Sequence, residues 1–283
     1  MAFNLLSRSL DSPISTWKRN VAIAEIAIYS LVLIIQFITR YIQEWRYWHH
    51  NKNKGVGRCV FYSWWGMIGL LSQIRIAGSA MVLASSQPEK PMLNAESILQ
   101  SVGLSPLLFE VSLVLLRCGQ SGETGSGNSK WTKRTRFALH FFRFPVLIAI
   151  MLAVVSGCIN MRALGEAGSI VLLVTFVYVC GLVGWLAVKS RSILPKSGHH
   201  AVLFTVLALP FLLVRIICFL LLENGPREYN PVTGDIDILV GTGLLMEIII
   251  VVLLFAARTV AEPVWSSMIA KRIVYDDLES TQN

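Results

Sequence analysis

The sequence predicts an all-α fold, a polytopic membrane bundle of seven transmembrane helices, and three observations support this class. The 283 residues are 54% hydrophobic and 15% charged, with a mean hydropathy of +0.60, whereas soluble domains contain about 25% charged residues. Apolar runs of about 20 residues, the length that crosses a bilayer, recur along the chain. Basic residues gather in alternate loops. We expect one seven-helix domain over residues 1–260 and a polar cytosolic tail over residues 261–283.

The predicted helices follow these apolar runs in order along the chain. The first 19 residues are polar and lack the apolar core and cleavage site of a removable signal peptide. The first helix is therefore expected to act as both anchor and targeting signal. Pro106 and Glu110 interrupt the third run and Pro210 lies in the sixth, and both prolines are expected to kink their helices. The runs cover approximately residues 20–40, 60–84, 93–116, 138–160, 168–188, 201–222 and 237–257.

The charge of the loops predicts the orientation of the bundle. The first, third and fifth loops and the C-terminal tail together hold 16 basic residues, and the opposite side holds 6. The positive-inside rule places the N-terminus outside or in the lumen and the C-terminus in the cytosol. This distribution explains the net charge of +8, so we expect anionic lipids and no nucleic acid beside the basic loops. The endoplasmic reticulum membrane is the default location.

The sequence gives no sign of a cofactor or a metal. Walker loops, Rossmann glycine patterns and nucleophile elbows do not occur. The five cysteines are scattered without a C-x-x-C pair, so we expect neither a disulfide scaffold nor a zinc site.

Charged residues inside the predicted spans are the main functional signal. Glu25, Arg75, Arg215 and Glu247 lie in runs that are otherwise apolar, and each such charge costs about 2.5–3.5 kcal/mol on insertion scales. The predicted orientation places all four in the outer leaflet, together with Glu96 and Gln100 of the third span. The opposite leaflet holds Glu110, with His140 and Arg143 at its edge.

Two interpretations of this cluster stay open. The arginines could form buried salt bridges that fix helix register and do nothing else. Alternatively, the cluster lines a polar pocket that opens toward the lumen. Two arginines and three carboxylates leave one acid without a formal partner, and a desolvated, unpaired carboxyl stays protonated and suits a general acid. We predict Glu247 and Glu25 as catalytic acids and Arg75, Arg215, Gln100 and Glu96 as substrate-binding residues.

Four stretches surround these charges: Gln73–Gly78, Gln100–Leu108, Leu209–Arg215 and Met246–Glu247. They resemble the recurring segments of an uncharacterised fungal family of seven-helix integral membrane proteins. The chain is also similar, in size and helix count, to the membrane-bound terpene cyclases of fungal secondary metabolism. That similarity implies protonation of an epoxide or alkene by an intramembrane carboxylic acid, without a cofactor.

Two classes of function are therefore expected. The first is a membrane enzyme, a terpenoid or meroterpenoid cyclase, whose partners are a lipophilic small molecule, membrane lipids and pathway enzymes in the same membrane. The alternative is a seven-helix receptor or a proton-coupled transporter that uses the same polar cluster. The sequence lacks the internal repeat that marks many transporters.

Overall fold

The described part of the computed structural model contains helices and no strands. It comprises residues 16–49, 66–84, 103–120, 132–159, 162–194, 196–224 and 239–261. This part of the chain confirms the predicted all-α class. Its helices are α2 (Thr16–His49), α4 (Met67–Ala84), α6 (Leu104–Gln120), α7 (Lys133–Phe141), α8 (Arg143–Ile159), α9 (Arg162–Ile193), α10 (Lys196–Asn224), the π-helix η2 (Leu239–Leu245) and α12 (Met246–Val260).

Six helical segments among the described residues are long and apolar enough to cross a membrane, and the chain is therefore a membrane protein. They coincide with six of the seven predicted spans. The exception is the third, which is described only from Gly103 onward and contains the 17 residues of α6. The total of seven spans and the orientation of the ends stay predictions. The six segments are Arg19–Ile42, Met67–Ala84, Lys133–Ser156, Ala163–Arg191, Gly198–Leu221 and Val240–Val260.

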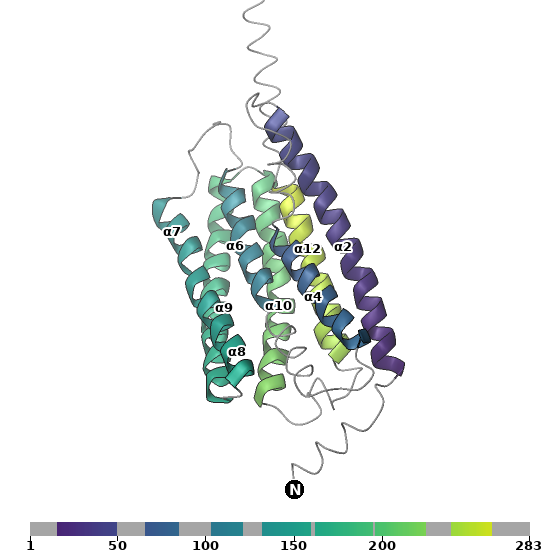
Figure 1. The fold of residues 1–283 in the computed structure, drawn as a ribbon. Coiled ribbons are helices and arrows are strands. Elements are labelled where there is room, and N and C mark those ends of the chain that lie inside the picture. The colour runs from purple at the N-terminus through teal and green to yellow at the C-terminus, as the bar shows by residue number, and fades with distance from the viewer. Residues whose placement is uncertain are drawn as a thin grey trace, which may run out of the picture.

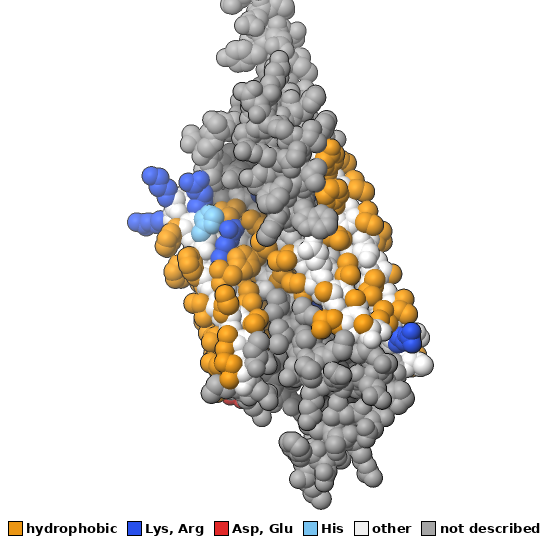
Figure 2. Space-filling model, viewed as in Figure 1, with side chains coloured by type: hydrophobic (Ala, Val, Ile, Leu, Met, Phe, Trp, Pro, Cys, Tyr) orange, Lys and Arg blue, Asp and Glu red, His pale blue; other side chains and the backbone are white. Residues whose placement is uncertain are grey.

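Helix α6 occupies the interior of the bundle. It packs against α4, α8, α10 and α12, and Figure 1 shows it between α7–α9 on one side and α2 and α4 on the other. Its apolar side chains Leu107, Leu108, Val111 and Val114 are fully buried. The outward faces of the other helices are apolar as well (Figure 2), which is the surface that lipid tails solvate.

The prolines of the third and sixth predicted spans lie within α6 and α10, and the kink at Pro210 stays a prediction. Pro106 lies in the first turn of α6 as described, where a missing N–H leaves no hydrogen bond unmade. Helix α10 continues through Pro210. An unexpected break separates α7 from α8 at Phe142 inside the fourth predicted span. Pro145 explains this break, because a proline ring clashes with the carbonyl four residues earlier, that of Phe141.

The seventh predicted span begins irregularly. Residues Leu239–Leu245 form a π-helix and regular α-helix starts only at Met246. Gly241 and Gly243 lie in this segment, and glycine is a weak α-helix former. π-Helical turns often mark functional sites, and this one leads directly into Glu247.

Candidate functional site

A buried ionic cluster centres on Glu247, in the first turn of α12. This side chain is fully buried, and both of its oxygens accept two contacts each. Oε1 accepts hydrogen bonds from Tyr29 Oη (2.8 Å) and Arg75 Nε (2.7 Å). Oε2 accepts a short hydrogen bond from Arg75 Nη2 and lies 3.0 Å from Arg215 Nη2. One carboxyl group thereby ties α2, α4 and α10 to α12.

Besides the Glu247 carboxyl, each guanidinium group lies close to the backbone of a glycine. A Cβ atom added at Gly103 would lie 3.1 Å from Arg75 Nη2, and one added at Gly243 would lie 3.1 Å from Arg215 Nη1. Both distances are tighter than ordinary carbon contacts. The absence of a side chain at these two glycines leaves room for Arg75 and Arg215 beside Glu247. Gly243 belongs to the π-helix η2.

A second carboxyl group, that of Glu25, lies one helical turn from the residues that contact Glu247. Glu25 precedes Tyr29 by four residues on α2, and Ser79 follows Arg75 by four residues on α4, so each pair shares a helix face. Ser79 Oγ donates a 2.5 Å hydrogen bond to Glu25 Oε2. Glu25 is half-buried, whereas Glu247 is sealed from solvent. With both glutamates ionised, the two arginines and two glutamates are formally neutral.

The two acids have unlike surroundings. Every contact to Glu247 comes from a donor, and a guanidinium group has no acceptor that could take a proton. Glu247 is therefore placed to position Arg75 and Arg215. Glu25, in contrast, accepts a hydrogen bond from the neutral hydroxyl of Ser79. This geometry favours Glu25 over Glu247 as a proton donor.

Sequence reasoning named some residues of this cluster and missed others. Arg75, Arg215 and Glu247 meet in space, and Glu25 lies beside them through Ser79. The predicted residues Glu96 and Gln100 lie outside the described residues. Tyr29 and Ser79 were missed because neither is charged, although their four-residue spacing from Glu25 and Arg75 would have placed them on the same faces.

A second ionic contact lies further along α12. Arg258 Nη1 donates to Glu110 Oε1 of α6 at 3.1 Å, and both side chains are buried. Helix α12 continues to Val260, past the predicted end of the seventh span at residue 257, and buries Arg258. Arg40, at the predicted end of the first span, is likewise buried on α2. Both are among the basic residues that the sequence places on the cytosolic side.

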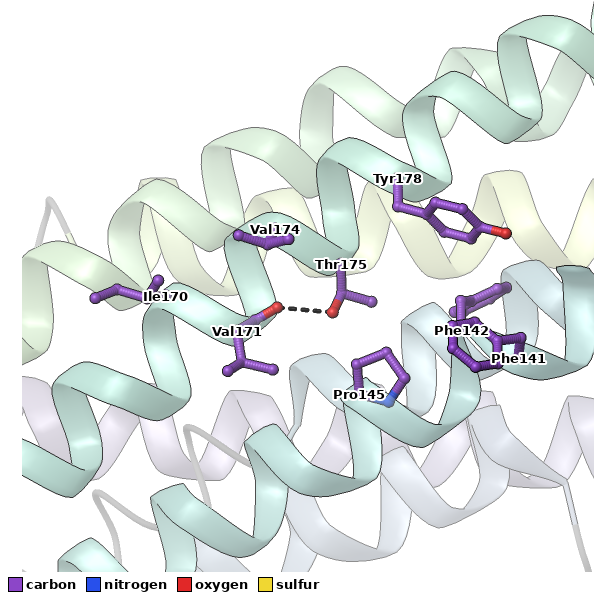
Figure 3. Close-up of a pocket in the computed structure, with 8 residues that line it drawn as sticks. All are labelled: Phe141, Phe142, Pro145, Ile170, Val171, Val174, Thr175 and Tyr178. Atoms are coloured by element: carbon purple, nitrogen blue, oxygen red, sulfur yellow. Dashed lines mark hydrogen bonds between the residues drawn. The ribbon is translucent and has the colours of Figure 1, made fainter.

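An apolar pocket of about 320 Å³ lies elsewhere, between α8 and α9. Figure 3 shows its walls, which include Phe142, Pro145 and Val174. Its one threonine, Thr175, donates its hydroxyl to the carbonyl of Val171 at 2.7 Å and so offers the pocket no free donor. Neither this pocket nor a basic pocket beside α7 is lined by residues of the Glu247 cluster.

The described residues contain no group of three or more His, Cys, Asp or Glu side chains that could hold a metal ion. The two arginines of the cluster carry only donors, and these bind carboxylate or phosphate oxygens.

Comparison with known proteins gives a family but no activity. The model of a family described as a domain of unknown function, DUF7702, matches residues 16–261. This range spans every described helix. No curated protein and no solved structure matches the chain. The fungal origin and the similarity to terpene cyclases stay predictions.

Proposed function

We propose a function for this chain, which belongs to the DUF7702 family, from the geometry of its buried cluster. The protein is an integral membrane enzyme that transforms a lipophilic substrate beside Glu25. Glu25 donates the proton, Ser79 orients it, and Glu247 holds Arg75 and Arg215 in place. This assignment revises the sequence-based one, in which Glu247 and Glu25 were equal candidates for the acid.

One observation supports the proposal above the others. Two carboxyl groups lie in one cluster, and their environments differ sharply: one is bound by two guanidinium groups and a phenol, the other by one hydroxyl. Enzymes place two acids in contrasting environments so that one stays protonated and can donate its proton while the other stays ionised. The second acid, Glu25, contacts neither guanidinium group directly in the hydrogen bonds and ion pairs of the described residues.

The chemistry that fits this arrangement is cyclisation of a terpenoid or meroterpenoid. Glu25 would protonate an epoxide oxygen or an alkene carbon, and the resulting cation would cyclise and lose a proton to end as an isomer of the substrate. The proton lost from the cation replaces the one donated, so no oxidant or cofactor enters the balance. The phenol of Tyr29 and the carboxylate of Glu247 would lie near the developing positive charge.

The proposed setting follows from the substrate. A lipophilic substrate reaches the half-buried Glu25 through the bilayer, and pathway enzymes in the same membrane, taken as the endoplasmic reticulum, would supply it. The aqueous side of Glu25 is the predicted lumenal side. No nucleic acid is involved.

The test is an assay for isomers of unchanged mass. Microsomes that contain the full chain are incubated with prenylated and epoxidised candidate substrates, and the products are separated by chromatography coupled to mass spectrometry. Glu25→Gln keeps the shape of the side chain but removes the acidic proton, so it is expected to lower the rate by about 10²–10⁴-fold. Glu166→Gln on α9, away from the cluster, is the matched control.

Loss of product in Glu25→Gln together with normal product in Glu166→Gln supports the proposal. Equal rates in the two variants would overturn Glu25 as the acid. If no candidate substrate of either class yields an isomer with the wild-type protein, the cyclase chemistry is wrong.

A proton-coupled transporter is the second candidate, and a specific observation favours it. Helix α12 bears Glu247 near one end and Arg258 eleven residues later, which places two buried ionic layers about 16 Å apart along the bundle. In the described structure Glu110 Oε2 is buried without a hydrogen-bond partner. Uptake of a labelled solute into proteoliposomes, lost in Glu110→Gln and in Glu25→Gln, would favour the transporter over the enzyme.

A further inference from the structure

We propose that a basic pocket at the α6–α7 end of the bundle binds the phosphate headgroup of an anionic phospholipid. The pocket has a volume of about 570 Å³ and lies between the end of α6, helix α7 and the start of α8. It is separate from the Glu247 cluster and does not depend on the proposed enzymatic function.

The lining of the pocket is strongly cationic. Arg117, Lys133, Arg136 and Arg143 contribute four fixed positive charges, and His140 completes the polar wall. The remaining lining residues are two leucines of α6, and none of the described lining residues is acidic. Four cations held around one cavity repel each other unless an anion lies between them.

Two of the guanidinium groups have buried nitrogens that lack a partner. Arg117 Nη1 and Arg143 Nη2 are sealed from solvent, and neither has a hydrogen-bond partner among the described residues. A buried, charged N–H group that makes no hydrogen bond is strongly unfavourable. An anion in the pocket would satisfy both donors at once, because a phosphate group offers several acceptor oxygens to arginine.

Arg143 is held in position before any ligand arrives. Its Nε donates to Ser112 Oγ at 3.0 Å, and Ser112 in turn donates to the carbonyl of Leu139 at 2.8 Å. These two hydrogen bonds fix the plane of the guanidinium group and leave Nη2 without a hydrogen-bond partner among the described residues. A binding group that is already ordered loses little entropy when its ligand arrives.

The position of the pocket identifies the source of the anion. Figure 2 shows a group of basic side chains with one histidine directly beside an apolar outer surface. Phe137, Phe141 and Phe144 are exposed along the same helices, so the pocket lies where the bilayer core gives way to headgroups. The apolar pocket of Figure 3 uses Phe141 and Phe142, which lie between His140 and Arg143 in the sequence. A phospholipid meets both surfaces, with its phosphate on the arginines and its chains along the phenylalanines.

The experiment measures lipid retention by the full-length protein in an uncharged detergent. Native mass spectrometry counts bound phosphatidic acid, with phosphatidylcholine as the zwitterionic comparison and glycerol 3-phosphate as the water-soluble competitor. Each guanidinium lost is expected to weaken phosphatidic acid binding about tenfold, the effect of removing one charged hydrogen bond. Arg117→Gln and Arg143→Gln together should therefore weaken it about 100-fold.

The matched control is Arg134→Gln, which removes the same charge from α7. Arg134 is exposed and does not line the pocket, so binding should change by no more than about threefold. The single variant Arg117→Gln guards against misfolding, since the buried Nη1 of Arg117 has no hydrogen-bond partner among the described residues, whereas Arg143 is bonded to Ser112.

Selective retention of phosphatidic acid that falls in the pocket variants and persists in Arg134→Gln supports the proposal. Equal weakening by Arg134→Gln would mean a diffuse charge effect and would overturn it. Displacement of the lipid by equimolar glycerol 3-phosphate would assign the pocket to a soluble phosphate instead.

Discussion

Replacing Glu247 by glutamine tests whether the whole bundle depends on one carboxyl group. The variant keeps the size of the side chain but removes its charge. It leaves Arg75 and Arg215, each less than a tenth exposed, without the anion that both contact. The new amide N–H₂ would also point donors at guanidinium donors, because each carboxyl oxygen already accepts from at least one arginine.

The size of the effect follows from those contacts. Removing one partner of a buried ion pair destabilises a protein by about 3–5 kcal/mol. Here a single substitution strands two cations, so we expect the upper part of that range. Glu25 lies one layer away and offsets part of the excess charge, which argues against a larger value.

The assay is unfolding of the purified protein in detergent, followed by tryptophan fluorescence and by recovery of monodisperse protein after heating. Glu166→Gln, the same chemical change on the half-buried face of α9, should cost no more than about 1 kcal/mol, the typical effect of a single substitution. An additional Arg215→Leu substitution should recover part of the stability lost in Glu247→Gln, because one stranded cation is removed. Wild-type stability of Glu247→Gln would refute the described arrangement of the cluster.

Three further predictions use other parts of the chain. Gly103→Ala and Gly243→Ala should each lower the free energy of unfolding by about 1–3 kcal/mol, because the new methyl group crowds a guanidinium group. Gly181→Ala, in open space on α9, should instead raise it by about 0.5–1 kcal/mol in the same unfolding assay. Glu110→Gln should destabilise less than Glu247→Gln, since Glu110 forms its ion pair with one arginine, Arg258, whereas Glu247 contacts two. A glycosylation acceptor fused to the N-terminus should be modified and one fused to the C-terminus should not; the reverse pattern would contradict the predicted orientation.

Much of the fold could be predicted because bilayer thickness fixes the length of an apolar run. Six predicted spans coincide with helices for that reason. Their ends could not be predicted, since helices continue past the apolar run where polar residues also form helix. Helix α2 extends to His49, beyond the predicted end at residue 40. The π-helix before Met246 was missed because seven residues with two glycines give no periodic signal.

The depth of the site residues in the membrane could be predicted, but the rotation of each helix about its own axis could not. Charge alone marked Arg75, Arg215 and Glu247 and placed them at one level of the bundle, and that level follows from position along each helix. The hydrogen-bond and ion-pair partners of these residues depend on which face of each helix points into the bundle. Hydropathy does not determine that face for a helix that is apolar all round. The role of Tyr29 therefore emerged only from the structure. Arg258 was missed because the apolar run ends at residue 257, one residue too early.

A cluster that only stabilises the fold and a cluster that acts on a substrate predict different effects of replacing Arg75, Arg215 and Glu247. Buried ion pairs can often be replaced by well-packed apolar residues without loss of stability, so assembly alone does not explain why charges are present at this depth. The triple variant Arg75→Met, Arg215→Met and Glu247→Leu removes every charge of the central layer while keeping its volume. We expect it to fold and to lose all turnover of substrate, because nothing then positions Tyr29 or balances Glu25. Unchanged turnover in this folded variant would reduce the central layer to a helix-packing device and leave Glu25 and Ser79 as the functional unit.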